Sequence, residues 1–306
     1  MCPKANSVAI LLATYNGANF LVPQLNSFKN QSYCSWELYV SDDGSSDDTL
    51  AILEKFSRNS PTNVYSGPQK GFARNFLSLI NRSEVNASYY AFSDQDDIWC
   101  DDKLKRAVDF LSKIDDDLPA LYCCRTTLID SSDKIVGYST LYKKKPGIGN
   151  ALIQNIASGN TMVFNHAARK LLNRLYGKEI IAHDWSLYQI VAACGGAIFY
   201  DANPGVLYRQ HDGNLIGSGL NYFKRFQNFI EAVNGRSSRW NDINLDLLSC
   251  VEPDLSVDAK KVIHCIKKMR SSKLVERMKI FHFSGLYHQT TIGTLTNYCY
   301  AMLNKI

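Results

Sequence analysis

The strongest constraint on the fold is an alternation of apolar runs with helically spaced apolar residues, repeated four times before residue 120. Residues 8–13 are continuously apolar, as in a strand buried on both faces. Leu21, Leu25 and Phe28 then follow at helical spacing. Three more strands, each followed by a helix, are expected near residues 36–40, 63–65 and 89–92. This alternation predicts an α/β fold with a mostly parallel sheet flanked by helices on both faces.

The rhythm changes after Pro119. A hairpin or return strand is expected on either side of the "SSD" turn at 131–133. Helices near 167–175 and 185–193, a strand at 197–200, and a helical, increasingly basic region from about 221 complete the expected elements. The change of rhythm indicates a division near residue 118, within an α/β unit that we take as residues 1–217, followed by a helical C-terminal region over 218–306.

Composition excludes several classes of protein. The formal net charge of +5 is mild and does not by itself indicate a nucleic-acid partner. Nine scattered cysteines without a CxxC pair indicate neither a zinc site nor a disulfide framework, so reduced thiols are expected. No apolar run reaches the roughly 18 residues of a spanning helix. These features predict a cytoplasmic protein, with association at a membrane surface left open.

The stretch "YYAFSDQDDIW" at 89–99 places Asp94, Asp96 and Asp97 where a buried strand ends. Adjacent acids repel, and an acid in an apolar environment is costly unless it is paired or binds a cation. The segment is therefore either a solvated turn or a site for something positive.

Two other strand ends also carry polar side chains: Thr14, Tyr15 and Asn16 follow the first strand, and Asp42 and Asp43 follow the second. Ligands of open α/β sheets bind beyond the carboxyl ends of the strands. Each turn alone is ordinary turn chemistry, but three at one edge predict a ligand site.

The chemistry of that site follows from the residue types. No GxGxxG or Walker A sequence is present, which disfavours dinucleotide binding and P-loop phosphate transfer. A pair of acids suits a divalent cation, Mg²⁺ or Mn²⁺, whose shell is completed by substrate phosphates. Asp42 suits hydrogen bonds to a base or ribose.

Taken together, "ATYNG", "SDDGSSDDT", "FSDQDDIW" and the later "HDW" and "YRQH" resemble the family 2 glycosyltransferases with the GT-A (Rossmann-like) fold. The form "DQDDIW" is most similar to the bacterial rhamnosyltransferase-like branch. The resemblance runs from about Val8 to about Gly217 and implies a nucleotide-sugar half over about 1–118 and an acceptor half over about 119–217.

The resemblance also implies roles for individual residues. It places the family's DXD motif on Asp94-Gln95-Asp96, with Asp96 as metal ligand and Asp94 at the ribose or the metal shell. It implies that Asp184 is the general base and that His211 completes the metal site. The nucleotide pocket is expected to contain Thr14, Tyr15, Asn16, Asp42 and Asp43.

Three later features keep an alternative interpretation. Taken alone, Asp184 is better explained as a helix N-cap than as a base, since Asp is among the best capping residues, and the resemblance reverses that order. His211 lies in a polar loop after a strand, where Arg209 is instead available to offset diphosphate charge. The stretch "ASGNTMVF" at 157–164 either borders the acceptor or is only a turn entering a strand.

The resemblance implies an inverting transferase that moves a sugar from a nucleotide donor to an acceptor hydroxyl. It favours L-rhamnose from dTDP-L-rhamnose, passed to a polyprenyl-linked oligosaccharide in bacterial surface polysaccharide (O-antigen type) synthesis. The alternatives are a UDP-hexose or UDP-N-acetylhexosamine transferase of the same family, or a nucleotide-sugar-binding protein without catalysis. No reading motif for nucleic acid is present.

The segment 260–279 carries eight Lys and Arg residues against Glu276 alone. Val262, Ile266 and Met269 recur there at helical spacing. A basic amphipathic helix is typical of a membrane-surface element that binds anionic lipid. The alternative is a solvated helix face packed on the catalytic unit.

Overall fold

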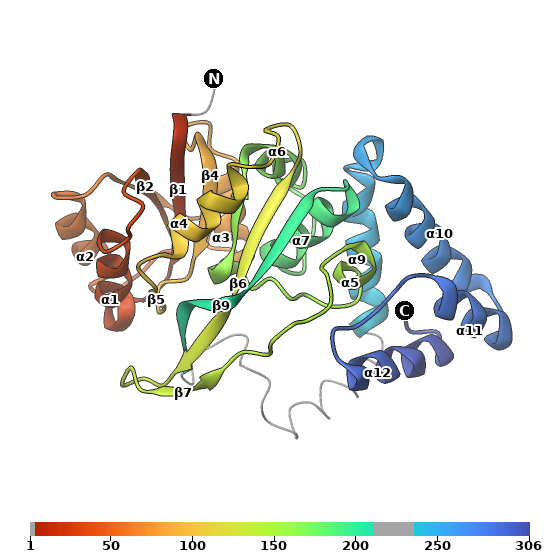
Figure 1. Ribbon diagram of the computed structural model, residues 1–306. Helices are drawn as coiled ribbons and strands as arrows, with labels where there is room; N and C mark the ends of the chain where they lie inside the picture. The colour runs from red at the N-terminus through yellow and green to blue at the C-terminus, as the bar shows by residue number, and fades with distance from the viewer. Residues whose placement is uncertain (1–3, 211–235) are drawn as a thin grey trace.

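The computed structural model describes residues 4–210 and 236–306 (Figure 1). Its first half contains β1 (Lys4–Thr14), α1 (Ala18–Lys29), β2 (Trp36–Asp42), α2 (Thr49–Ser57), β3 (Thr62–Ser66), α3 (Phe72–Ile80), β4 (Ala87–Ser93), β5 (Ile98–Trp99) and α4 (Lys103–Leu111). The four strand–helix units predicted from the apolar pattern are all present. The two-residue strand β5 is an addition that is too short for periodicity to reveal.

The second half contains β6 (Ala120–Ile129), β7 (Ile135–Tyr138), α5 (Ile148–Ala151), the 3₁₀ turn η1 (Gly159–Thr161), β8 (Val163–Asn165), α6 (His166–Asn173), α7 (His183–Ala193) and β9 (Ala197–Arg209). Strands β6 and β7 pair antiparallel, so the expected hairpin is confirmed. Strand β9 continues well past its predicted end, although Pro204 and Gly205 interrupt the apolar pattern. It does so because its pairing with β6 shifts register around Arg125, as a β-bulge allows.

The strands form one sheet in the order β3-β2-β1-β4-β8-β6-β9-β5, with β7 on the outside of β6. The segment β3-β2-β1-β4 is parallel throughout. Beyond β4 the sheet is mixed, because β8 runs antiparallel to both of its neighbours while β6 and β9 run parallel. The prediction of a mostly parallel sheet therefore holds for these four strands, and the rest of the sheet is mixed.

Strand β1 shows why the sheet is covered on both faces. Leu11 belongs to the core that includes α3, α6 and α7, whereas Ile10 and Leu12 belong to the core that includes α1, α2 and α4. All three side chains are fully buried. A strand in the middle of a two-sided sheet needs such a continuous apolar run.

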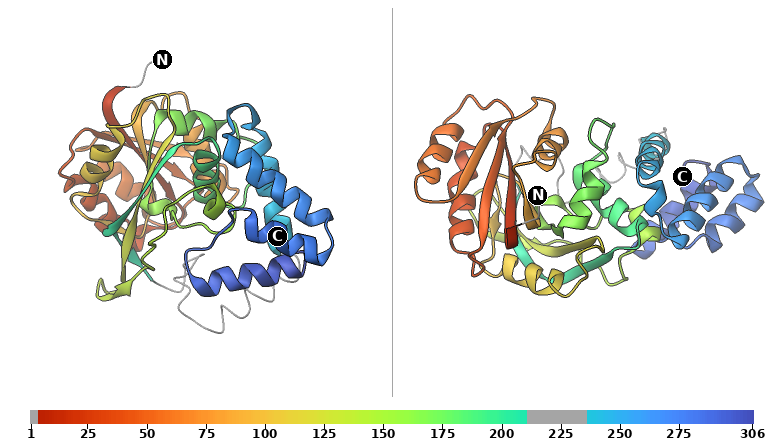
Figure 2. Two further views of the ribbon diagram at one scale, coloured as in Figure 1. Left: turned by 45° about the vertical axis from the view of Figure 1, so that its right-hand side comes forward. Right: turned by 90° about the horizontal axis from the view of Figure 1, so that it is seen from above.

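The C-terminal region contains α9 (Ser237–Ser249), the 3₁₀ turn η3 (Glu252–Asp254), α10 (Val257–Ser271), α11 (Leu274–Phe283) and α12 (Thr291–Met302). It lies at the opposite end of the molecule from α1 and α2 (Figure 2). Val262, Ile266 and Met269 of α10 are buried in the core shared with α3, α6 and α7. The apolar face of the basic segment therefore packs on the protein, and the segment is divided between two helices.

Within the described ranges, no helix combines the length and the apolar character that crossing a bilayer requires.

Candidate functional site

The ends of the first two strands meet at one edge of the sheet. Thr14 and Asp42 are register partners in β1 and β2, and Thr14 Oγ1 donates a 2.8 Å hydrogen bond to Asp42 Oδ2. On the other side of β1, Leu12 is the register partner of Ser93. The segment that begins at Asp94 therefore leaves the sheet beside Thr14, as the sequence predicted.

Asp42 is held by the turn that follows it. Its carboxylate accepts hydrogen bonds from Gly44 N (3.2 Å), Ser45 N (2.8 Å) and Ser45 Oγ (2.6 Å), and the residue is 5% exposed. This is the local side-chain-to-backbone pattern that Asp favours in turns. The carboxylate is thus fixed in direction, and its expected contact with a base stays a prediction.

The neighbouring Asp43 turns toward a different loop. Its carboxylate accepts hydrogen bonds from Gln69 N (2.5 Å) and Gly71 N (3.2 Å), in the connection between β3 and α3. Both of those residues have positive φ, at 54° and 84°, so the loop bends sharply there. Asp43 therefore ties the third strand–helix unit to the same edge.

The middle residue of the predicted DXD motif joins the first and fourth strand ends. The Gln95 amide accepts from Tyr15 N (2.9 Å) and donates to Tyr15 O (3.0 Å). A Cβ on Gly17 would come within 2.2 Å of Gln95 Oε1, so a larger residue there would displace the Gln95 amide from Tyr15. No role was predicted for Gln95, because a single amide side chain does not show in the sequence which distant residue it will bind.

Asn16 connects the first strand end to the second. Its backbone N donates to Ser45 Oγ (2.8 Å), and its side-chain Oδ1 accepts from Ser46 N (2.8 Å). Asn16 has φ of 47°, a left-handed conformation that Asn tolerates better than most residues. Tyr15, by contrast, leaves its side chain 58% exposed at the mouth of the site.

Two of the predicted acids, Asp96 and Asp184, act on the carboxyl group of a third, Asp94. Asp94 is half-buried, and its pKa is raised to about 7, first by burial and then by the carboxylates of Asp96 and Asp184. The structure therefore brings Asp184, 88 residues further along the chain, near the DXD acids. Tyr208 of β9 faces the same group: burial and then the neighbouring acids raise the pKa of its hydroxyl.

Asp97 has a different environment. It is fully buried, accepts from Asn160 Nδ2 (2.6 Å) and from Arg209 N (3.2 Å), and burial together with Asp96 and Asp94 raises its pKa. Because both oxygens have internal partners, Asp97 supports the loop from behind.

Asp184 lies in the first turn of α7, one residue after the helix begins at His183. The N-cap position is Ala182, so the expected alternative of an Asp184 N-cap does not describe the helix. Asp184 is 9% exposed and accepts from Gly159 N (3.1 Å) and Trp185 N (2.6 Å). Burial raises its pKa, which makes the carboxylate a stronger base near neutral pH.

The turn η1 links the base candidate to the DXD loop. Gly159 N holds Asp184, and the next residue, Asn160, holds Asp97. The Asn160 carbonyl in turn accepts a 2.8 Å hydrogen bond from Lys103 Nζ, which is fully buried 3.2 Å from the centre of the Trp99 ring. Asn160 and Lys103 are functional candidates that sequence reasoning missed, because the two residues are separated by 57 positions in the sequence and meet only in the fold.

His183, beside Asp184, is enclosed by aromatic rings. Its imidazole stacks on Phe76 with centroids 4.0 Å apart and meets Phe92 edge-on at 4.7 Å. Among the described residues, neither ring nitrogen has a hydrogen-bond partner. Burial lowers the pKa of His183 to about 3, so the ring is neutral at physiological pH.

Arg209 is 1% exposed and lies behind the acid loop. Its Nε donates to the Asp96 carbonyl (2.9 Å), and its Nη1 donates to the Asp130 carbonyl (3.2 Å) and to the Asp133 carboxylate. These contacts anchor the backbone of the predicted metal ligand. The expected role of Arg209 toward a diphosphate stays a prediction.

His211, the third predicted metal ligand, lies outside the described residues. Within 4–210 and 236–306, no group of three or more His, Cys, Asp or Glu side chains is arranged to hold a metal ion. Asp94 and Asp96 nevertheless offer the hard oxygen donors that Mg²⁺ or Mn²⁺ prefers, and two carboxylates suffice where phosphates complete the shell. The donor set therefore fits such a cation.

Comparisons with known proteins find similar sequences and similar folds. The model of the family "Glycosyl transferase family 2" matches residues 9–175. The dTDP-rhamnosyl transferase RfbG of Shigella flexneri is 29% identical over 229 residues, which cover 71% of this chain and 77% of that protein.

Solved structures show the same fold. S. aureus TarS 1-349, crystallised in complex with UDP-GlcNAc, superposes with a TM-score of 0.57 at 15% identity and covers 97% of this chain and 90% of its own. The mannosyltransferase PcManGT from Pyrobaculum calidifontis, in complex with GDP-Man and Mn²⁺, gives a TM-score of 0.51 at 17% identity, with 99% and 88% covered. The expected GT-A α/β fold is confirmed by these likenesses.

Proposed function

The chain belongs to glycosyl transferase family 2 and is a glycosyltransferase, and on that premise we propose that it transfers L-rhamnose from dTDP-L-rhamnose to a lipid-linked oligosaccharide. The product would extend a bacterial surface polysaccharide of the O-antigen type, assembled at the cytoplasmic face of the inner membrane. The likeness to a dTDP-rhamnosyl transferase over most of both chains supports the donor.

One observation carries the catalytic part of the proposal: the buried carboxylate of Asp184 lies near enough to Asp94 to raise its pKa, and it is held by the turn that also holds Asp97. A base and a pair of metal-binding acids at one sheet edge are what direct displacement at a sugar carbon requires. A protein that only binds nucleotide sugars needs no buried base there.

Asp184 would accept the proton of the attacking acceptor hydroxyl, which is a poor nucleophile until that proton begins to leave. The N–H groups of Gly159 and Trp185 aim its oxygens. With one base and no covalent intermediate, the sugar is displaced directly and its anomeric centre is inverted.

The donor side would be organised by the loops after β1, β2 and β4. Asp42 and Thr14 line the nucleotide pocket, with Tyr15 exposed beside them, and Asn16 and Asp43 fix the surrounding loops. Asp96, with Asp94, would hold Mg²⁺ or Mn²⁺, which when bound stabilises the charge that develops on the leaving diphosphate. His211 stays a proposed further ligand.

The second candidate is a UDP-hexose or UDP-N-acetylhexosamine transferase with the same machinery. It is favoured by the fold likeness to TarS, whose structure contains UDP-GlcNAc. Donor choice depends on pocket shape, and small differences there change selectivity strongly. Turnover of a panel of UDP-, GDP- and dTDP-sugars, with Mn²⁺ present, separates the two candidates.

The test of the mechanism is Asp184→Asn. Asn keeps the size of Asp and one acceptor oxygen but cannot take a proton. We expect turnover to fall by about 10²–10⁴-fold, the usual contribution of a positioned base. Donor affinity should change little, because the donor contacts lie on Asp42, Asp96 and the metal. Turnover, donor affinity and melting temperature are measured on one preparation.

Glu179→Gln is the matched control, because Glu179 is an exposed acid that precedes the same helix and pairs with Arg239. Its turnover should equal that of the wild type. Normal turnover of Asp184→Asn would remove the proton acceptor from this mechanism. If donor affinity fell by the same factor as turnover, Asp184 would instead be assigned to donor binding.

A further inference from the structure

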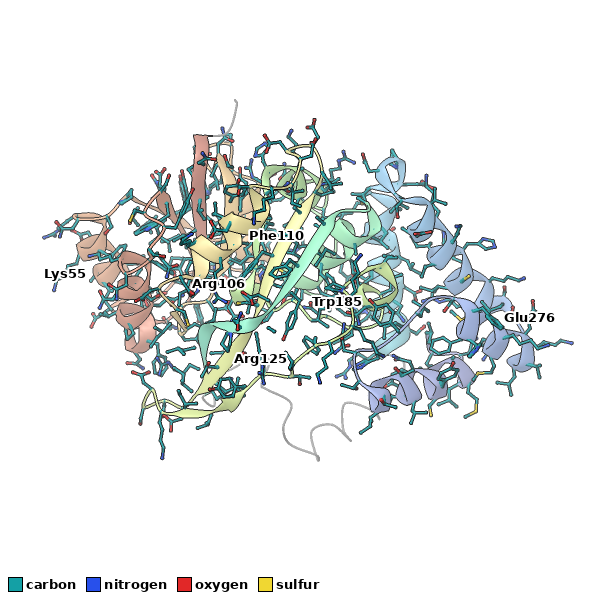
Figure 3. All side chains as sticks on the ribbon, in the orientation of Figure 1. Lys55, Arg106, Phe110, Arg125, Trp185 and Glu276 are labelled. Atoms are coloured by element: carbon teal, nitrogen blue, oxygen red, sulfur yellow. The ribbon has the colours of Figure 1, made fainter. Side chains whose placement is uncertain are left out.

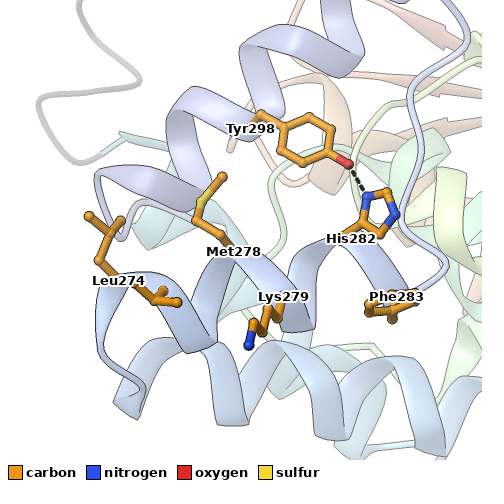
Figure 4. Close-up of a pocket in the computed structure, with 7 residues that line it drawn as sticks. Leu274, Met278, Lys279, His282, Phe283 and Tyr298 are labelled. Carbon is orange, nitrogen blue, oxygen red and sulfur yellow. Dashed lines mark hydrogen bonds between the residues drawn. The ribbon is translucent and has the colours of Figure 1, made fainter.

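Helix α11 leaves large apolar side chains in solvent. Val275 is 69% exposed and Phe283 is 82% exposed, and Leu274 is 49% exposed beside them. They line an open apolar hollow of about 450 Å³ together with Met278, Lys279, His282 and, from α12, Tyr298 (Figure 4). The 2.8 Å hydrogen bond between His282 Nδ1 and the Tyr298 hydroxyl joins the two helices beneath it.

Helix α12 carries a second exposed apolar stripe. Ile292 is 77% exposed, Leu295 is 61% exposed and Met302 is 49% exposed. Their spacing places them on one side of the helix, whereas Asn297 and Ala301 face inward and are buried. Contiguous exposed apolar surface of this kind marks an interaction site more often than it occurs by chance.

Charge shows what kind of partner fits. Residues 257–306 contain nine Lys and Arg and two acids, a net charge of +7, so residues 1–256 carry −2 of the chain's +5. Lys273, at the N-cap of α11, and Lys279, four residues from both Val275 and Phe283, are exposed among the apolar residues. Glu276, at the far end of the molecule from Lys55 in Figure 3, forms an ion pair with Lys268 (3.5 Å).

We infer that these residues form a docking surface for an anionic lipid bilayer, here called the α11–α12 surface: Leu274, Val275, Phe283, Ile292, Leu295 and Met302, together with Lys273 and Lys279. Apolar side chains enter the boundary between headgroups and acyl chains while the lysines attract anionic headgroups. A second copy of this chain is a poorer partner, because a two-fold contact would bring two regions of charge +7 together.

The sequence left open whether the amphipathic pattern of 260–279 binds a membrane or packs on the protein. The apolar face of α10 is used inside the protein, and the free apolar surface lies on the two helices that follow. Strand β1 starts beside the N-terminal label at the top of Figure 1 and runs downward, and α12 lies low in the same view.

The inference rests on the proposed function for its purpose, since a lipid-linked acceptor is presented at a bilayer, but its test is separate. The full chain is sedimented with vesicles of phosphatidylglycerol and phosphatidylcholine, or of phosphatidylcholine alone. We expect binding to the anionic vesicles that weakens as salt rises, because surface attraction is screened. Donor hydrolysis without vesicles, measured in parallel, tests the proposed function alone.

The decisive variant replaces Val275, Phe283 and Ile292 by Ser. Because all three are exposed, we expect the same melting temperature and donor hydrolysis and at least tenfold weaker binding to anionic vesicles. The matched control replaces Leu50, Ile135 and Val136, which are 47%, 57% and 57% exposed elsewhere, and should bind as the wild type does. In a second arm, Lys273→Gln with Lys279→Gln should reduce the dependence of binding on salt.

Three results would overturn the inference: no binding of the wild type to anionic vesicles, equal binding by the triple variant, or a wild-type dimer in solution that the triple variant abolishes. The last would assign the α11–α12 surface to self-association.

Discussion

Each carboxylate at the site edge has its own set of partners. Asp42 is held by its turn, Asp97 by Asn160 and Arg209, and Asp184 by two backbone N–H groups. Asp94 is half-buried among other acids, which is why its pKa rises. A divalent cation would relieve that repulsion, so the metal and the acids are expected to stabilise each other.

Asp96→Ala tests the metal ligand. Arg209 binds the carbonyl of residue 96, not its side chain, so the loop should stay anchored in the variant. We expect Mn²⁺-dependent nucleotide binding and turnover to be lost while the melting temperature stays within a few degrees. Asp101→Ala, an exposed acid five residues along, is the control. Near-normal turnover in metal-depleted buffer would contradict the role of Asp96.

His183 should make stability depend on pH. Its folded pKa of about 3 lies below the ordinary value of 6.5, so the unfolded chain takes up a proton that the folded protein refuses. The free energy of unfolding contributed by His183 is therefore complete above pH 6.5 and falls by about 1.4 kcal/mol per pH unit below it, down to about pH 3.

This slope is measured as the difference between wild type and variant in urea unfolding from pH 7 to 4.5. His183→Phe and His183→Leu cannot titrate, so both should lose the slope, whatever packing costs each one adds. A slope that is unchanged in both variants would show that His183 is not the group responsible.

At the scale of elements, the apolar pattern predicted each strand–helix unit of the first half, because a strand buried on both faces has a strong local signature. It underestimated β9, where Pro204 and Gly205 interrupt the run but a bulge carries the pairing onward. The acids of the site were visible for the same reason as the strands: they stop apolar runs abruptly.

Gln95, Asn160 and Lys103 were not predicted, because each acquires its role from a partner distant in sequence. A buried lysine is unusual, but in the sequence Lys103 is only a basic residue at the start of a helix. Burial lowers the pKa of Lys103 to about 7. Only the three-dimensional contact with the Asn160 carbonyl shows what it supports.

The η1 turn gives a prediction at this scale. Asn160→Ala would leave a buried Asp97 oxygen without its partner, at a cost of about 1–3 kcal/mol, and Asn160→Asp would add repulsion. We expect both variants to have lower turnover and to need more Mn²⁺ for half-activation. Turnover should be lower in Asn160→Asp than in Asn160→Ala. Asn63→Ala, which removes a similar 2.9 Å bond to Glu37 at the sheet edge, should change neither property. An Asn160 variant with normal metal dependence would limit the turn to a structural role.

At the scale of the whole molecule, the catalytic unit and the C-terminal helices share one core. Leu247, Val262 and Phe281 belong to the same buried cluster as Leu11 of β1. Ser256 N also donates to the Ala193 carbonyl, and Tyr287 N to the Gly149 carbonyl. Regions joined in this way are expected to unfold together.

The four tryptophans allow a direct test of joint unfolding. Trp185 and Trp240 pack edge-to-face at 5.9 Å between α7 and α9, whereas Trp36 and Trp99 lie in the first half. Two variants, each retaining one pair and carrying Phe at the other, should each show the same unfolding midpoint by fluorescence and by circular dichroism. Different midpoints for the two probes within a single variant would show that the parts unfold independently.

The uneven distribution of charge affects how the protein approaches an anionic membrane, before the two touch. Opposite net charges of −2 and +7 in successive parts of one chain give the protein an electric dipole. In the field of an anionic surface, which extends about 8 Å at physiological ionic strength, such a molecule experiences a torque as well as an attraction. It would arrive with its C-terminal helices leading, so fewer encounters would be lost to wrong orientations.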